Sequence, residues 1–224
     1  MTAILVDGGF YLKRAKALWG EKTPEDRANE LIEYCHRHLK DGHRNNELYR
    51  IFYYDCPPAT KTVFNPVTQK SDNLEKSDIY KWSTSFQNEL KKKRKVALRL
   101  GRLSDGQINY MLKYETLKEL CSGKRSLESL TQSDLTLTIV QKGVDMKIGL
   151  DISSIAFKKQ ANQIVLIAGD SDFVPAAKLA RREGIDFILD PLWSPIKPEL
   201  FEHIDGLNSK TPKPKAKVAA LLEE

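Results

Sequence analysis

Cysteine is scarce in this sequence, and the few cysteines form no pattern. Only three of the 224 residues are cysteines, Cys35, Cys56 and Cys121, and no CxxC pair exists. An odd number of widely separated cysteines argues against a disulfide framework and is typical of a protein from a reducing compartment. We therefore expect a cytoplasmic protein.

Long hydrophobic runs and targeting segments are also lacking. No apolar stretch approaches the roughly 20 residues that a membrane-spanning helix needs, so we expect no membrane association. The N-terminus, Met1 to Asp7, enters a strand pattern directly and has no basic leader, which predicts that there is no signal peptide. Hydrophobic residues make up 41% and charged residues 29% of the chain, a composition typical of a soluble globular protein with a proper core.

Three common catalytic signatures are missing. The chain contains Gly8-Gly9 but no GxGxxG dinucleotide fingerprint, no GxxxxGK[ST] phosphate-binding loop and no GxSxG nucleophile motif. P-loop nucleotide hydrolysis and serine hydrolase chemistry are therefore not supported, and any activity must come from other residues.

Positive charge is concentrated in one segment. The formal net charge is +6, but residues 81–102 alone hold eight basic residues against one acid, Glu89, so that the rest of the chain sums to about −1. Such a local excess favours contact with a polyanion, although cations also suit the C-terminal end of a helix. We expect a nucleic acid, most simply RNA, to be held by these residues and by Lys142: Lys91, Lys92, Lys93, Arg94, Lys95, Arg99 and Lys142.

Apolar runs of strand length alternate with helical patterns along the chain. The expected strands are residues 3–6, 48–54, 96–103, 135–141, 163–168 and 185–190. Strands that alternate with helices predict parallel pairing and a three-layer α/β/α sandwich with a mainly parallel sheet. We expect one domain over residues 1–205 with an insertion at about 104–133, a substrate-ordered loop at 59–76, a tight turn at Gly8-Gly9 and a flexible basic tail over 206–224.

Acidic residues follow three of these strands. Asp7 ends the first strand, Asp145 comes just after the strand at 135–141, and Asp170 and Asp172 follow the strand at 163–168. The C-terminal ends of parallel strands gather at one sheet edge, so we expect these carboxylates to face one pocket. Carboxylates that close repel one another unless they are protonated or bound to a cation, and oxygen ligands suit Mg²⁺ or Mn²⁺.

Each of these acids also has a purely structural interpretation. Asp7 precedes Gly8-Gly9 and is a common type of turn residue. Asp145 and one of Asp170 or Asp172 are at positions where an acid caps a helix or occupies its first turn. A second cluster, Cys35, His36, His38 and His43, contains residue types that bind zinc, but we expect only a solvated helix end there.

Four motifs together resemble the NYN domain family, and more narrowly its LabA-like (DUF88) branch within the PIN-like nuclease superfamily. They are Ile4-Leu-Val-Asp-Gly-Gly-Phe10, Phe52-Tyr-Tyr-Asp-Cys-Pro-Pro58, Lys142-Gly-Val-Asp-Met-Lys-Ile-Gly-Leu-Asp151 and Ala168-Gly-Asp-Ser-Asp-Phe-Val-Pro-Ala176. The resemblance spans about residues 3–192. It implies an α/β/α sandwich, metal-dependent RNA cleavage, and Asp7, Asp145, Asp170 and Asp172 as Mg²⁺ ligands.

Two functions thus remain open on the sequence. The first is a Mg²⁺- or Mn²⁺-dependent ribonuclease, expected to be an endoribonuclease. The second is a nucleic-acid-binding regulatory protein that kept the acidic pocket without useful turnover. A phosphohydrolase with Asp7 as nucleophile is less favoured, because position 9 is glycine rather than a second Asp. A homodimer is compatible with either function.

Overall fold

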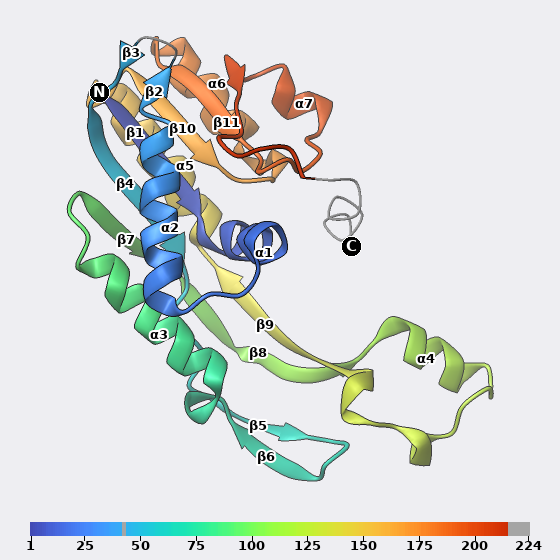
Figure 1. Ribbon diagram of the computed structural model, residues 1–224. Coiled ribbons are helices and arrows are strands. Elements are labelled where there is room, and N and C mark those ends of the chain that lie inside the picture. Colours follow the sequence, from blue (N-terminus) through green and yellow to red (C-terminus); the bar gives the residue numbers. More distant parts are fainter. Residues whose placement is uncertain (42–43, 215–224) are drawn as a thin grey trace.

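A six-stranded parallel sheet forms the centre of the molecule (Figure 1). The computed structural model describes residues 1–41 and 44–214. The strands of this sheet are β1 (Thr2–Asp7), β4 (Leu48–Asp55), β7 (Val96–Leu100), β10 (Gln163–Ile167), β11 (Asp186–Asp190) and β12 (Gly206–Leu207). Their order is β12-β11-β10-β1-β4-β7, and every neighbouring pair is parallel. The predicted three-layer α/β/α fold is confirmed.

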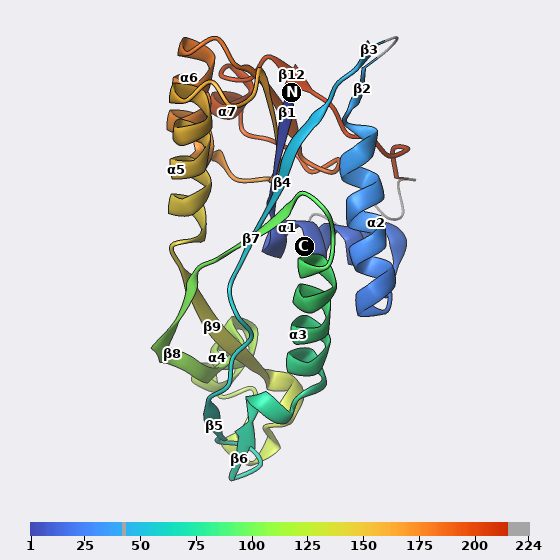
Figure 2. The same cartoon turned by 90° about the vertical axis from the view of Figure 1, so that its left-hand side faces the viewer.

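Helices cover both faces of this sheet, as the edge-on view in Figure 2 shows. One face carries α1 (Gly8–Trp19), α2 (Pro24–Arg37) and α3 (Asp78–Lys91), and the other carries α5 (Val144–Phe157) and α6 (Val174–Arg182). Successive residues of a strand point to opposite faces. In β1, Ala3 and Leu5 join the core under α5 and α6, whereas Ile4 and Val6 join the core under the other three helices. Burial on both faces explains the continuous apolar runs of the central strands.

The strand order reverses between β1 and β10. From β1 the chain continues outward to β4 and β7, and it returns to the other side of β1 for β10, β11 and β12. Loops that follow the two strands at such a reversal diverge to opposite faces and leave a crevice at the C-terminal edge of the sheet, where α/β proteins bind ligands. Asp7 ends β1, and Asp170 follows β10 by three residues.

A lobe of two antiparallel hairpins extends from the sheet (Figure 1). One hairpin pairs β5 (Thr62–Asn65) with β6 (Lys70–Asn73), and the other pairs β8 (Arg102–Leu112) with β9 (Leu135–Lys142). The helix α4 (Tyr114–Cys121) connects β8 to β9. Val63, Leu74 and Ile108 form a small core that joins the hairpins.

The lobe corrects two expectations. Residues 59–76 are not a loop but contain the β5–β6 hairpin, in which only Val63 and Asn65 of the first strand are buried. The strand at 135–141 exists but pairs antiparallel with β8 and lies outside the central sheet. Each segment forms a hairpin with a nearby part of the chain. Composition alone does not distinguish a hairpin strand from a loop or from a strand of the central sheet.

The first turn of α1 differs from expectation as well. Gly8 and Gly9 are helical rather than a tight turn, and the Asp7 side chain caps the helix. Helix α2 begins after a capping threonine, since Thr23 Oγ1 accepts from the backbone N–H of Asp26 at 3.1 Å.

Other short elements include β2 (Lys40–Asp41), β3 (Arg44–Asn45) and α7 (Pro198–Phe201). No helix in the part of the chain described is long and apolar enough to cross a membrane.

The C-terminal segment was expected to be a flexible tail from residue 206. Instead, Gly206–Leu207 form the edge strand β12, and the residues after it pack against α2. Ser209 Oγ donates to the buried carboxylate of Asp190 at 2.7 Å, and the backbone N–H of Lys210 donates to Tyr34 Oη at 3.1 Å. The folded domain thus extends beyond residue 205, while Lys215 and Lys217 lie outside the described residues.

Candidate acidic active site

The carboxylate of Asp7 lies at the reversal of strand order and is largely removed from water. Its Oδ1 accepts from the backbone N–H of Phe10 at 3.1 Å, which caps α1 and lowers the pKa. Burial has the larger, opposite effect, and the negative charges of Asp145 and Asp55 add to it, so that the pKa of Asp7 is raised to about 6. The structural role suggested for Asp7 is therefore real, but capping alone does not require a desolvated acid beside two others.

Asp55 is an acid of this edge that the sequence analysis did not select. It ends β4, the strand next to β1, and its negative charge raises the pKa of Asp7. Its Oδ1 accepts from the backbone N–H of Cys56 at 2.7 Å, and burial raises its own pKa. The rule that singled out Asp7, an acid at the end of a buried strand, applies to Asp55 equally and would have found it.

Asp145 reaches the same edge from a different layer. It is the second residue of α5, which starts after Gly143 in a left-handed conformation (φ 81°) that glycine adopts without strain. Asp145 is exposed, yet the surrounding protein partly desolvates it and raises its pKa, as do the charges of Asp170 and Asp172. Because Asp145 also raises the pKa of Asp7, it connects the acids of β1 and β4 to those that follow β10.

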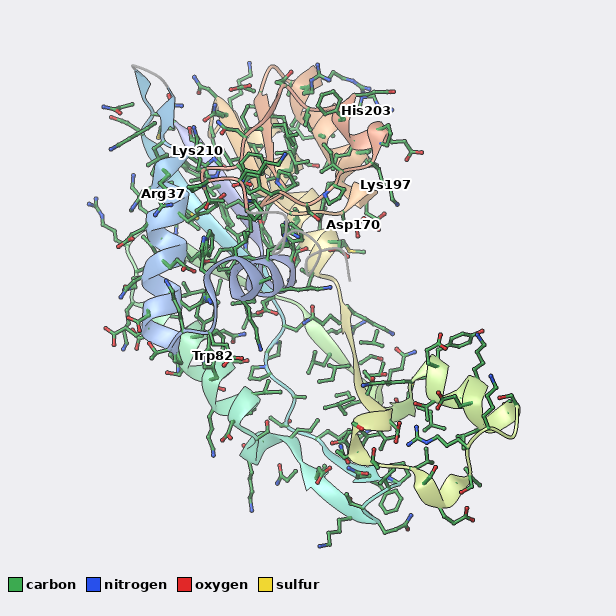
Figure 3. The ribbon with its side chains drawn as sticks, turned by 45° about the vertical axis from the view of Figure 1, so that its right-hand side comes forward. Arg37, Trp82, Asp170, Lys197, His203 and Lys210 are labelled. Carbon is green, nitrogen blue, oxygen red and sulfur yellow. The ribbon has the colours of Figure 1, made fainter. Side chains whose placement is uncertain are left out.

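A one-turn 3₁₀ helix, Ser171–Phe173, lies between β10 and α6; Asp170 immediately precedes it and Asp172 is its second residue. Asp170 Oδ1 accepts from the backbone N–H of Asp172 at 3.2 Å, so Asp170 is the acid that caps this turn. Both side chains are exposed. Figure 3 places Asp170 at the end of the sheet from which the lobe extends.

Two glycines allow the acid-bearing turns to approach one another. A Cβ on Gly169 would lie 2.4 Å from the ring of Phe10, so the turn after β10 can pass α1 only without a side chain there. A Cβ on Gly101 would lie 2.7 Å from the carbonyl oxygen of Lys142, where β7 meets the base of the lobe. Both contacts are shorter than real Cβ atoms show, so both positions need glycine.

The donor set fits a hard divalent cation in its chemistry. Carboxylate oxygens at a partly desolvated sheet edge are the ligands that Mg²⁺ and Mn²⁺ prefer. Across the described residues, however, no three carboxylate, imidazole or thiol groups stand close enough together to hold an ion as they are. The acids influence one another's pKa, but a cation would have to draw them closer.

The basic residues expected to bind nucleic acid do not form one surface. Lys91 to Lys95 precede β7 and therefore lie at the N-terminal edge of the sheet, a strand length away from the acids. Within this group Lys92 pairs with Glu89 at 2.7 Å, and Lys93 donates to Asn29. Arg94 is exposed.

Arg99 forms an ion pair with another part of the protein. Its guanidinium binds Asp151 of α5 through two hydrogen bonds of 2.7 and 2.8 Å and lies over the ring of Phe52. Lys142, by contrast, lies at the acidic edge, three residues before Asp145 and paired with Arg102 at the open end of the β8–β9 hairpin. Arg102, the last residue of the basic segment 81–102, is thus the cross-strand neighbour of Lys142 at this edge.

The Cys/His cluster is not a solvated helix end. Cys35 is fully buried, and His38 Nε2 lies 2.8 Å from Asp190 Oδ2, with both side chains almost completely buried. Tyr34 also donates to Asp190. Among the described residues this cluster offers no metal site either, and His43 lies outside them.

The structure is a three-layer α/β/α sandwich with acids at the C-terminal edge of its sheet, an architecture consistent with a PIN-like fold. A model of the NYN domain family matches residues 113–193, which supports placing the chain in that family. The match includes Asp145, Asp170 and Asp172 but begins after Asp7 and Asp55, which lie outside it. No curated protein matches the chain.

Proposed function

We propose that this protein is a divalent-metal-dependent ribonuclease that cuts within an RNA strand. The observation that carries the proposal is that carboxylates from β1, β4, α5 and the turn after β10 lie at the reversal of strand order, where burial and, to a lesser extent, the neighbouring carboxylate charges raise the pKa of Asp7 and Asp145. Repulsion among carboxylates destabilises a fold, so a purely structural role does not account for placing these acids together. The NYN match supports the same chemistry, since that family consists generally of nucleases.

Asp7, Asp145, Asp170 and Asp172 are the residues that would hold Mg²⁺ or Mn²⁺, with Asp55 beside them. A bound divalent ion supplies Lewis acidity, a water of lowered pKa and stabilisation of the leaving oxygen. The chain's own contribution is to hold the acids in place: the Phe10 N–H orients Asp7, the Asp172 N–H orients Asp170, and Cys56 N–H orients Asp55. Lys142 and Arg102 at the rim offer positive charge to a phosphate backbone.

A second candidate is a nucleic-acid-binding regulatory protein of the same fold. The observation that supports it is that, within the described chain, no three potential metal ligands lie close enough together to hold an ion. This is expected of a pocket that no longer turns substrate over. The two candidates predict the same RNA affinity but differ in cleavage.

The deciding experiment compares wild type with Asp170→Asn/Asp172→Asn on a panel of labelled RNAs in Mn²⁺. We expect cleavage by wild type, abolished by EDTA and reduced roughly 100-fold or more in the double variant. Asp186→Asn is the matched control, because Asp186 is an exposed acid at the N-terminal end of β11, on the opposite sheet edge. If wild type cleaves no better than the double variant while both bind RNA, the regulatory function is the correct one.

A further inference from the structure

A groove leads away from the acids into the lobe. Its volume is about 960 Å³, at the upper end of the size of ligand sites. Gly9 and Asp55 line it at the acidic edge, Ile79 and Tyr80 line it from the first turn of α3, and Tyr110 lines it from β8. The groove therefore runs continuously from the candidate active site to the two hairpins.

The walls of the groove are fixed before any ligand binds. Tyr110 Oη donates to Asp72 Oδ2 at 2.9 Å, which joins the two hairpins across the floor. The buried Asn65 donates to the same carboxylate at 3.2 Å. Gln87 Nε2 donates to the carbonyl oxygen of Cys56 at 2.9 Å and so ties α3 to the end of β4. A preformed groove binds without the entropy cost of ordering its walls.

The chemistry of the lining suits bases better than phosphates. Among the described residues that line it, Lys76 is the single Lys or Arg, against the two acids Asp55 and Asp72. The rest is mainly apolar or aromatic, and it includes Ile79, which leaves 77% of its surface exposed. Flat apolar faces stack on such a lining whatever the base, whereas a phosphate backbone requires cations. The cations nearest the acids, Lys142 and Arg102, belong to the base of the lobe instead.

We propose that this groove is a subsite for unpaired bases of the RNA strand whose phosphate lies at the acidic edge. The inference rests on the proposed function for the position of that phosphate. A base enters the groove only when it is free of a complementary strand, so the subsite makes the protein selective for single-stranded RNA. The alternating α/β pattern predicted the strand at 135–141 but not the pairing of either hairpin that builds this groove.

The subsite is tested by RNA binding of the full chain in EDTA, measured by fluorescence anisotropy. The probes are a labelled single-stranded RNA, the same strand with abasic riboses at its central positions, and its duplex. Ile79→Asp and Tyr80→Ala are the groove variants. Tyr114→Asp is the matched control, because Tyr114 is likewise an exposed residue in the first turn of a helix but lies on α4, away from the groove.

We expect each groove variant to bind the single strand roughly 5- to 150-fold more weakly, which is the loss of about one base stack. Tyr114→Asp should bind like wild type. Wild type should bind the abasic strand and the duplex more weakly than the intact single strand. For the groove variants, replacing the intact strand by the abasic strand should weaken binding little further. Melting curves establish that each variant is folded, and Tyr80→Ala provides a second readout if Ile79→Asp is not.

Equal binding of all three probes by wild type, or unchanged binding by both groove variants, overturns the subsite. Cleavage in Mn²⁺ is measured separately on the same proteins. Cleavage that persists without any base dependence refutes the subsite and leaves the ribonuclease standing. Base-dependent binding without cleavage refutes the ribonuclease and leaves the subsite standing. If the groove instead takes an apolar peptide, no RNA probe will distinguish the groove variants from the control.

Discussion

Asp7 both caps a helix and carries a charge in a place that disfavours charge. Its side chain holds the first turn of α1, while burial and the neighbouring Asp145 and Asp55 raise its pKa from 3.8 to about 6. An acid with a raised pKa in the folded state stabilises the fold only while it is protonated. That contribution is complete below pH 3.8 and is lost as the pH rises through 6.

Asp7→Asn should therefore stabilise the metal-free protein at pH 7.5 by up to about 3 kcal/mol, the equivalent of a shift of roughly two pKa units. Asparagine still accepts the capping hydrogen bond, so the helix start is kept. The gain should shrink as the pH falls and disappear near pH 4. Urea unfolding in EDTA at several pH values measures it. A gain that is absent at pH 7.5, or that grows toward low pH, contradicts the electrostatic origin.

The two glycines after Asp7 give a matched pair of substitutions. A Cβ on Gly8 would lie 2.5 Å from the ring of Tyr53, whereas a Cβ on Gly9 would meet only Asp7 Oδ1, at 3.7 Å. We expect Gly8→Ala to cost roughly 1–3 kcal/mol or more of unfolding free energy and Gly9→Ala to gain about 0.4–1 kcal/mol. Thermal melting of both variants provides the comparison. A similar loss of unfolding free energy in both variants would contradict the close contact between α1 and β4 at Gly8.

At the level of elements, the segment after β11 is held by one buried carboxylate. Asp190 receives hydrogen bonds from Tyr34 of α2, from the N–H of Leu192 and from Ser209, so one side chain joins a helix, a strand and the C-terminal segment. A carboxylate without surface exposure needs these partners, because an unpaired buried charge is costly. This network explains why β12 and the residues after it belong to the folded domain.

Tyr34→Phe and Ser209→Ala should each lower the unfolding free energy by about 1–3 kcal/mol, since each leaves a lone pair of Asp190 unsatisfied. The two losses should not add in the double variant, because both act on the same carboxylate. Ser122→Ala is the control, since its exposed hydroxyl donates to the carbonyl oxygen of Glu119 at the end of α4, and we expect a change within about 0.5 kcal/mol. Full additivity in the double variant would contradict a shared network.

The two groups of cations lie at opposite edges of the sheet, and this arrangement leads to a prediction about substrate binding. Arg102→Ala and Lys142→Ala should each weaken RNA cleavage about fivefold or more and reduce its salt dependence, because both residues flank the acids. Lys91→Ala and Lys92→Ala should change it less than twofold for a short RNA. Cleavage rates of a short oligonucleotide between 50 and 200 mM salt test this. A larger effect of the lysine pair would mean that the strand crosses to the N-terminal edge.

For the molecule as a whole, the sequence was sufficient to predict the layers but not the lobe. Strands buried on both faces give continuous apolar runs, and acids at their ends follow from the direction of the chain, which is why β1, β10 and Asp7 were predicted. The β5–β6 hairpin buries only alternate residues over four positions, too few for a periodic signal. Distances across the fold are likewise not encoded locally, so the separation of Lys91 from Asp145 became evident only in three dimensions.

The acids of three separate elements, β1, α5 and the turn after β10, are proposed to form one divalent-cation site, with Asp55 of β4 beside it. A crystal soaked in Mn²⁺ tests it most directly, because the anomalous scattering of manganese locates the ion independently of any activity. We predict a peak bounded by Asp7, Asp145 and the turn that carries Asp170 and Asp172, with the carboxylates drawn in around it. A saturating soak that gives no peak there, with the acids still apart, would contradict the claim.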